Sequence, residues 1–97
     1  MNNKNKNKEI KNENPEKERL RKAYNLFVQG INYYKGLNLE IALDAFEKVK
    51  LIIDEAYPKI EKDKDLKEKT DKFLTQVKQY ISTTEKRIKN KYIRISS

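Results

Sequence analysis

The sequence predicts an all-α protein, an antiparallel three-helix bundle. Three stretches carry apolar residues at the spacing of a helix with one buried face. Only two glycines and two prolines occur in 97 residues, too few for a β fold with many turns. The 39% of charged residues against 36% of hydrophobic ones fits a small bundle with solvated outer faces. We expect one domain over residues 15–95, with helices at about 15–35, 39–60 and 66–93.

The first helix is expected to begin at Pro15, because Asn14 can cap it and proline suits the first helical position. Gly30 interrupts the apolar stripe of this helix, which indicates a close approach to another helix. The stripe consists of Leu20, Ala23, Tyr24, Phe27, Ile31 and Tyr34. Residues 1–14 are rich in Asn and Lys and carry too few apolar side chains to offset their chain entropy, so we expect disorder there.

The second helix lies at the centre of the predicted bundle. A turn at 35–38 precedes it, where we expect Gly36 to take the left-handed conformation and Asn38 to cap the new helix through its side chain. Pro58 lacks an N–H donor, so the last turn should kink or fray. The apolar stripe consists of Leu39, Ala42, Leu43, Phe46, Val49 and Ile53.

The third helix carries more apolar residues than two neighbouring helices require. Asp65 and Glu68 are predicted to form a capping box at its start. One stripe consists of Leu66, Thr70, Phe73, Val77, Tyr80 and Thr84, and a second row repeats every seven residues at Leu74, Ile81, Ile88 and Ile95. The second row suits a wider contact with the core, a partner helix, or a contact between copies of this chain, which would make an oligomerisation domain.

The chain lacks the residues on which several chemistries depend. It has no histidine, no cysteine and no glycine-rich phosphate loop. Nucleophile–base pairs, zinc sites and nucleotide phosphate binding therefore have no candidates, and we expect no enzyme activity, no metal and no cofactor. No apolar run approaches the length of a membrane span, so we expect a cytoplasmic protein.

A basic patch is predicted near the C-terminal end, where no acidic residue follows Glu85. It consists of Lys86, Arg87, Lys89, Lys91 and Arg94. These cations can be a solvated helix end that complements the helix dipole. They can also form a surface for microtubules or an anionic membrane. We expect no nucleic-acid binding, because most of the aromatic residues fall on predicted core stripes.

Two families have helical hairpins of this kind. Gly30, Tyr33, Ala42 and Phe46 match the signature spacing of a tetratricopeptide repeat, but no second repeat follows at the period of about 34 residues. Residues 19–88 resemble an MIT (microtubule-interacting and trafficking) domain over more of the chain. The resemblance rests on small or aliphatic residues in the first helix, on residues 38–43 before an aromatic in the second, and on residues 80–85 in the third. The positions in the first helix are Ala23, Leu26 and Gly30.

The resemblance implies a binding function. MIT domains are three-helix modules that capture short helical or extended tail segments of ESCRT-III subunits. They often stand at the N-terminus of AAA ATPases, so this chain would be such an N-terminal domain, monomeric by itself and peripheral to endosomal membranes. Ile81 would form the apolar floor of the site, and Glu85 would accept a hydrogen bond from a basic partner residue. The full implied set is Ala45, Lys48 and Ile52 on the second helix with Leu74, Lys78, Ile81, Ser82 and Glu85 on the third.

Overall fold

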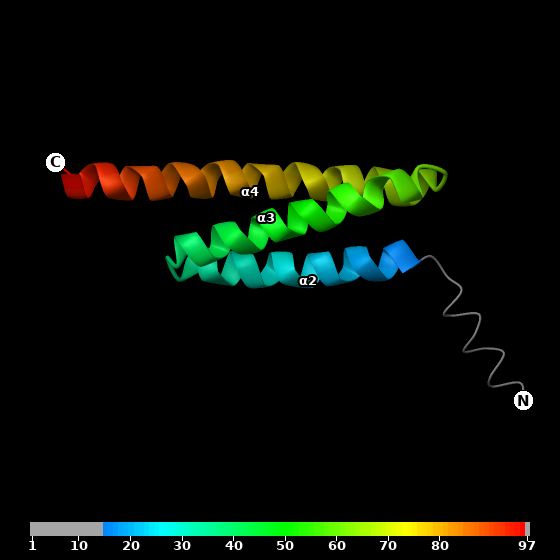
Figure 1. Ribbon diagram of the computed structural model, residues 1–97, viewed down its shortest axis with the longest axis horizontal. Helices are drawn as coiled ribbons and strands as arrows, with labels where there is room; N and C mark the ends of the chain where they lie inside the picture. Colours follow the sequence, from blue (N-terminus) through cyan, green and yellow to red (C-terminus); the bar gives the residue numbers. More distant parts are fainter. Residues whose placement is uncertain (1–14, 97) are drawn as a thin grey trace, which may run out of the picture.

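The computed structural model describes residues 15–96, and side chains as far as Lys91. Three α-helices, α2 (Pro15–Lys35), α3 (Leu39–Ala56) and α4 (Lys64–Ser96), confirm the predicted three-helix bundle. Figure 1 shows α3 running beside both α2 and α4, with neighbouring helices antiparallel. The disorder predicted for residues 1–14 lies outside the described residues, as do the side chains of Arg94 and Ile95.

The core is built around Phe46 of α3, which is fully buried. Its ring lies 5.6 Å from that of Phe27 on α2 and 5.2 Å from that of Tyr80 on α4, measured between centroids. Phe27 also meets Phe73 edge-on at 5.4 Å. Aromatic rings from all three helices therefore close the bundle. Tyr24 was expected in the core but is 54% exposed, although its ring still contacts Phe73 at 5.7 Å.

Gly30 lies at a close approach between α2 and α3, as its place in the apolar stripe predicted. A Cβ atom at Gly30 would lie 2.6 Å from Cε1 of Phe46 and 3.3 Å from Cβ of Ala45. Both distances are shorter than ordinary van der Waals contact. Because Phe46 is itself fully buried, its ring has no free space to move into.

Replacing Gly30 with alanine is therefore expected to lower the free energy of unfolding by about 1–2 kcal/mol, because overpacking outweighs the better helix propensity of alanine. Urea denaturation followed by circular dichroism measures the change. Gly36→Ala is the matched control: a Cβ there meets its nearest neighbour at 3.6 Å. Equal effects of the two substitutions would show that the close approach at Gly30 does not matter.

The turn between α2 and α3 differs from the prediction at one residue. Leu37, not Gly36, takes the left-handed conformation, with φ at 67°. The N–H of Leu37 donates to the carbonyl of Tyr34 at 3.0 Å, and the N–H of Asn38 donates to the carbonyl of Tyr33 at 2.9 Å. These two bonds form a Schellman motif, whose left-handed position glycine usually fills. The glycine at 36 precedes that position by one residue.

Leu37→Gly is expected to raise the free energy of unfolding by about 1 kcal/mol, because the left-handed conformation is unfavourable for a residue with a Cβ. Leu37 is 61% exposed, so little buried apolar surface would be lost. Thermal denaturation would measure the gain. A variant less stable than the parent would mean that the leucine side chain contributes more than its strained backbone removes.

The helix caps also differ from the sequence interpretation. Asn38 precedes α3, but its side chain makes no capping hydrogen bond; only its carbonyl accepts, from the N–H of Ala42 at 3.0 Å. At α4 the cap is Asp63 and not Asp65, because Oδ1 of Asp63 accepts from the N–H of Leu66 at 3.1 Å. Helix α4 therefore begins two residues earlier than expected.

Pro58 acts as predicted on the end of α3. The α-helical part stops at Ala56, and η1 (Tyr57–Ile60) continues as a 3₁₀ helix with the proline near its start. The tighter turn directs the buried side chain of Ile60 into the core. It also orients Tyr57 toward α4.

Candidate functional site

Helix α4 presents two apolar edges, one on each side of its buried centre at Val77. Phe73 and Tyr80 form the first edge, and their rings contact α2. The second edge, here called the outer row, consists of the half-buried residues Leu74, Ile81 and Ile88. The first edge closes the bundle, and the outer row retains apolar surface in contact with solvent.

One edge of α3 faces the outer row. Tyr57, at the end of this edge, donates a hydrogen bond from its hydroxyl to Oδ1 of Asp71 on α4, with 2.6 Å between the oxygens. Leu43 and Lys50 precede Tyr57 by multiples of seven residues, so they lie on the same edge, and both are half-buried. We call this edge together with the outer row the outer face.

The residues of α3 that the resemblance implied do not lie on the outer face. Ala45 is buried against α2, since its Cβ lies 3.3 Å from the Cβ position of Gly30. Ile52 follows Ala45 by seven residues, and Lys48 lies between them on the same side. These three residues therefore occupy the α2 edge of α3, which differs from the expected position opposite Ile81. Helical periodicity identified the buried stripe but not which neighbour lies on each side of it.

The implied residues of α4 do share one face. Lys78 and Glu85 follow Leu74 and Ile81 by one helical turn each, and both are exposed. Ser82 is exposed and lies farther toward solvent. Within the described residues no cation forms an ion pair with Glu85. An apolar row with a carboxylate beside it can bind an amphipathic segment that carries a basic residue.

The hydrogen bond from Tyr57 shifts the titration of its hydroxyl. The carboxylate of Asp71 accepts this hydrogen bond, which favours the neutral phenol and raises the pKa of Tyr57. A raised pKa means that this stabilisation is present below the usual tyrosine value, about 10, and is lost as the pH rises through the higher value. At neutral pH the bond is intact and closes one end of the outer face.

The basic patch does not form a single surface. The guanidinium of Arg87 lies over the ring of Tyr34 on α2, 5.2 Å from its centroid. Nζ of Lys91 lies 3.6 Å from Oε2 of Glu40 on α3. Lys86 and Lys89 are exposed on other sides of α4. The structure therefore directs Arg87 and Lys91 toward the α2–α3 turn and leaves Lys86 and Lys89 on other sides of the helix.

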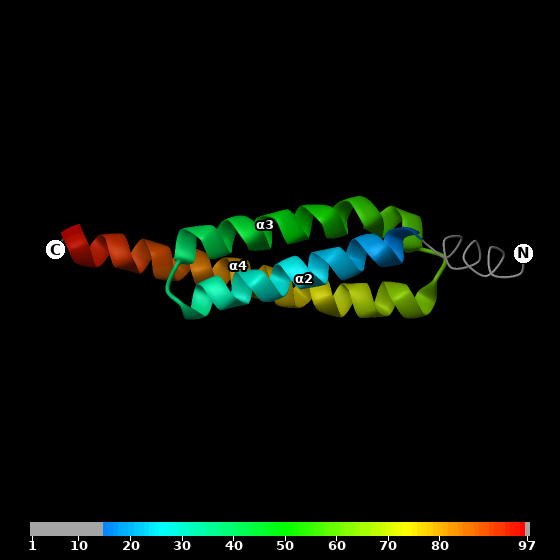
Figure 2. The same cartoon turned by 90° about the horizontal axis from the view of Figure 1, so that it is seen from below.

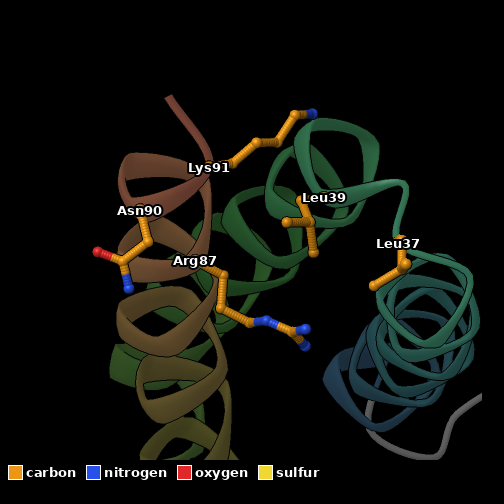
Figure 3. Close-up of a pocket in the computed structure, with 5 residues that line it drawn as sticks. All are labelled: Leu37, Leu39, Arg87, Asn90 and Lys91. Atoms are coloured by element: carbon orange, nitrogen blue, oxygen red, sulfur yellow. The ribbon is translucent and has the colours of Figure 1, made fainter. Parts of the chain in front are cut away.

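The two cations directed toward the turn line an open cavity of about 470 Å³. Figure 3 shows Arg87 extending from α4 in the direction of the α2–α3 turn, which carries Leu37, while Leu39 lies at the start of α3. Asn90 and Lys91 complete the lining. Sequence reasoning missed this hairpin cavity, because no pattern indicated that Leu37 would take a left-handed conformation beside α4.

The described part of the chain, residues 15–96, contains no candidate metal site and no candidate membrane span. No group of three or more His, Cys, Asp or Glu side chains is placed to hold a metal ion in this part of the chain. None of its helices is both long and apolar enough to cross a membrane.

Comparison with known proteins gives no match, whether with protein-family models, with curated proteins or with solved structures.

Proposed function

We propose that this chain is a non-catalytic protein-interaction module similar to an MIT domain. It binds short helical or extended tail segments of ESCRT-III-type subunits and recruits a larger protein, such as an AAA ATPase, to endosomal membranes. The observation that supports this proposal is the half-buried outer row of α4, beside an exposed carboxylate. The family assignment rests on the resemblance in residues 19–88 and on the shared three-helix architecture.

The outer row supports binding because Leu74 and Ile81 pack against the side of the core yet stay half-buried, so part of their apolar surface remains in contact with solvent. Phe27, Phe46 and Tyr80 already connect the three helices. Burying the remaining apolar surface of Ile81 and its neighbours under a partner segment gains about 25 cal/mol for each Å² removed from water. A partner with apolar residues at helical spacing can cover the row, and a lysine or arginine on it can pair with Glu85. We expect micromolar affinity, about −8 kcal/mol.

The bound segment lies on the outer face. The α3 residues that contact it there differ from those that the resemblance implied. Leu43 and Tyr57 supply apolar surface along its α3 side, and Lys50 is already paired with Asp54, 3.0 Å away. The α3 side thus carries a lysine whose charge Asp54 balances, whereas Glu85 on α4 has no ion-pair partner among the described residues. A basic residue of the partner is therefore expected to lie nearer α4 than α3.

Glu85→Lys is expected to weaken binding of a synthetic ESCRT-III tail peptide by about tenfold, because a charge-assisted hydrogen bond becomes a repulsion. Fluorescence anisotropy of a labelled peptide measures the affinity. Glu68→Lys is the matched control, since Glu68 is exposed on the same helix but outside the outer face. The assignment of Glu85 fails if both variants lose the same affinity, or if neither loses any.

A second copy of the chain could also cover the outer row. Analytical ultracentrifugation distinguishes this case from peptide binding. The proposed module sediments as a monomer at high protein concentration, whereas a dimer that dissociates in Ile81→Asp would assign the outer row to self-association.

A further inference from the structure

We propose that the hairpin cavity is a second binding site, which takes an acidic peptide segment carrying one apolar side chain. The cavity lies between the α2–α3 turn and α4 and is lined by Leu37, Leu39, Arg87, Asn90 and Lys91. It shares no residue with the outer face. The proposal therefore does not depend on the function assigned to Ile81 and Glu85.

The charge of the cavity selects the ligand. Arg87 is held over the ring of Tyr34, and no carboxylate in the described part of the chain forms an ion pair with it. Lys91 does have a partner, Glu40, but both side chains are about half exposed, at 45% and 51%. Exposed pairs of this kind contribute little and exchange readily. A carboxylate entering the cavity therefore meets a preorganised guanidinium and a lysine that can turn toward it.

The apolar part of the cavity comes from the two leucines. Leu39 is buried and lines the inner part of the α3 side of the cavity. Leu37 is 61% exposed although its backbone is left-handed, where glycine would fit without strain. An exposed leucine in a strained position adds little to folding, and strain of this kind concentrates at functional sites. The side chain of Leu37 instead provides apolar surface for a ligand side chain beside the two cations.

The shape of the cavity favours a peptide over a membrane surface. In Figures 1 and 2, α4 continues past the α2–α3 turn, so the cavity lies in an inner corner between the turn and the helix. A side chain can enter such a corner. A flat bilayer would first meet the part of α4 that projects beyond the turn.

The test uses a short fluorescein-labelled aspartate peptide that carries one leucine, and a control peptide in which serine replaces that leucine. The parent chain is expected to bind the first peptide at least tenfold more tightly than the second, because only the first has an apolar anchor. Arg87→Gln should weaken that binding by about tenfold, the loss expected for a charge-assisted contact. Lys89→Gln, which removes the same charge from the same helix outside the cavity, should change it less than twofold.

Leu37→Gly separates binding from folding, because this variant is expected to be more stable and yet to bind the leucine-containing peptide more weakly. Equal losses in Arg87→Gln and Lys89→Gln would overturn the proposal in favour of non-specific attraction between charges. A membrane ligand would replace the peptide if two results came together. The parent chain would bind neither peptide, and it would sediment with phosphatidylserine vesicles while Arg87→Gln would not. Ile81→Asp should leave the affinity for this peptide unchanged. A negative result for the hairpin cavity is therefore distinct from a negative result for the outer face and its proposed function.

Discussion

Phe46→Ala is expected to lower the free energy of unfolding by about 3–5 kcal/mol, the usual effect of removing a fully buried aromatic ring. Phe46 has no exposed surface, and its ring contacts those of Phe27 and Tyr80. Its removal leaves a cavity at the point where all three helices meet. A small domain has a total stability of only about 5–15 kcal/mol, so the variant should be largely unfolded at modest denaturant concentrations.

Guanidinium denaturation followed by far-ultraviolet circular dichroism measures this effect. Leu51→Ala is the control, because Leu51 is on the same helix and 59% exposed. This substitution should lower the free energy of unfolding by less than about 0.5 kcal/mol. If Phe46→Ala unfolds at the same midpoint as Leu51→Ala, the aromatic contacts do not hold the three helices together.

Ile81→Asp should abolish measurable binding of an ESCRT-III tail peptide, which is the largest functional effect we expect. The substitution places a charge at the centre of the outer row, where a partner segment would have to bury it, and burying an unpaired carboxylate is strongly unfavourable. Isothermal titration calorimetry would measure the loss. Ile81 packs against the side of the core but is only half-buried, so the variant should be less stable than the parent and yet stay helical, which circular dichroism would verify.

Ile41→Asp is the matched control for this variant. Ile41 is 52% exposed and lies on the α2 edge of α3, one turn before Ala45. Ile41→Asp should keep the affinity for the tail peptide within about twofold of that of the parent chain. If Ile41→Asp abolishes binding and Ile81→Asp does not, the partner occupies the edge that holds Ala45, Lys48 and Ile52.

Helical periodicity predicted the fold because each buried stripe contains several residues that agree. The bounds of α2 match the expectation, and Ala42, Phe46 and Val49 are all fully buried as predicted. Pro58 changed the helix type where its missing donor required it. Such features depend on one helix at a time, so the local sequence is sufficient to predict them.

Features that depend on how two elements meet were not predictable in the same way. The stripe of α3 shows which residues are buried, but only the packing of α3 against Gly30 of α2 decides that Ala45 lies away from α4. Two aspartates near the start of α4 are equally good caps by type, and the turn geometry selects Asp63. The position of Leu37 follows from the Schellman hydrogen bonds rather than from the glycine beside it.

Amide chemical-shift mapping is the most direct measurement of the proposed function. A ¹⁵N-labelled chain would be titrated with the unlabelled ESCRT-III tail peptide. We predict that the largest shift changes fall along the outer face, at Leu43 and Lys50 on α3 and at Leu74, Ile81 and Ile88 on α4. Shift changes confined to the α2 edge of α3, or none at peptide concentrations well above micromolar, would contradict the assignment of the outer face as a binding surface.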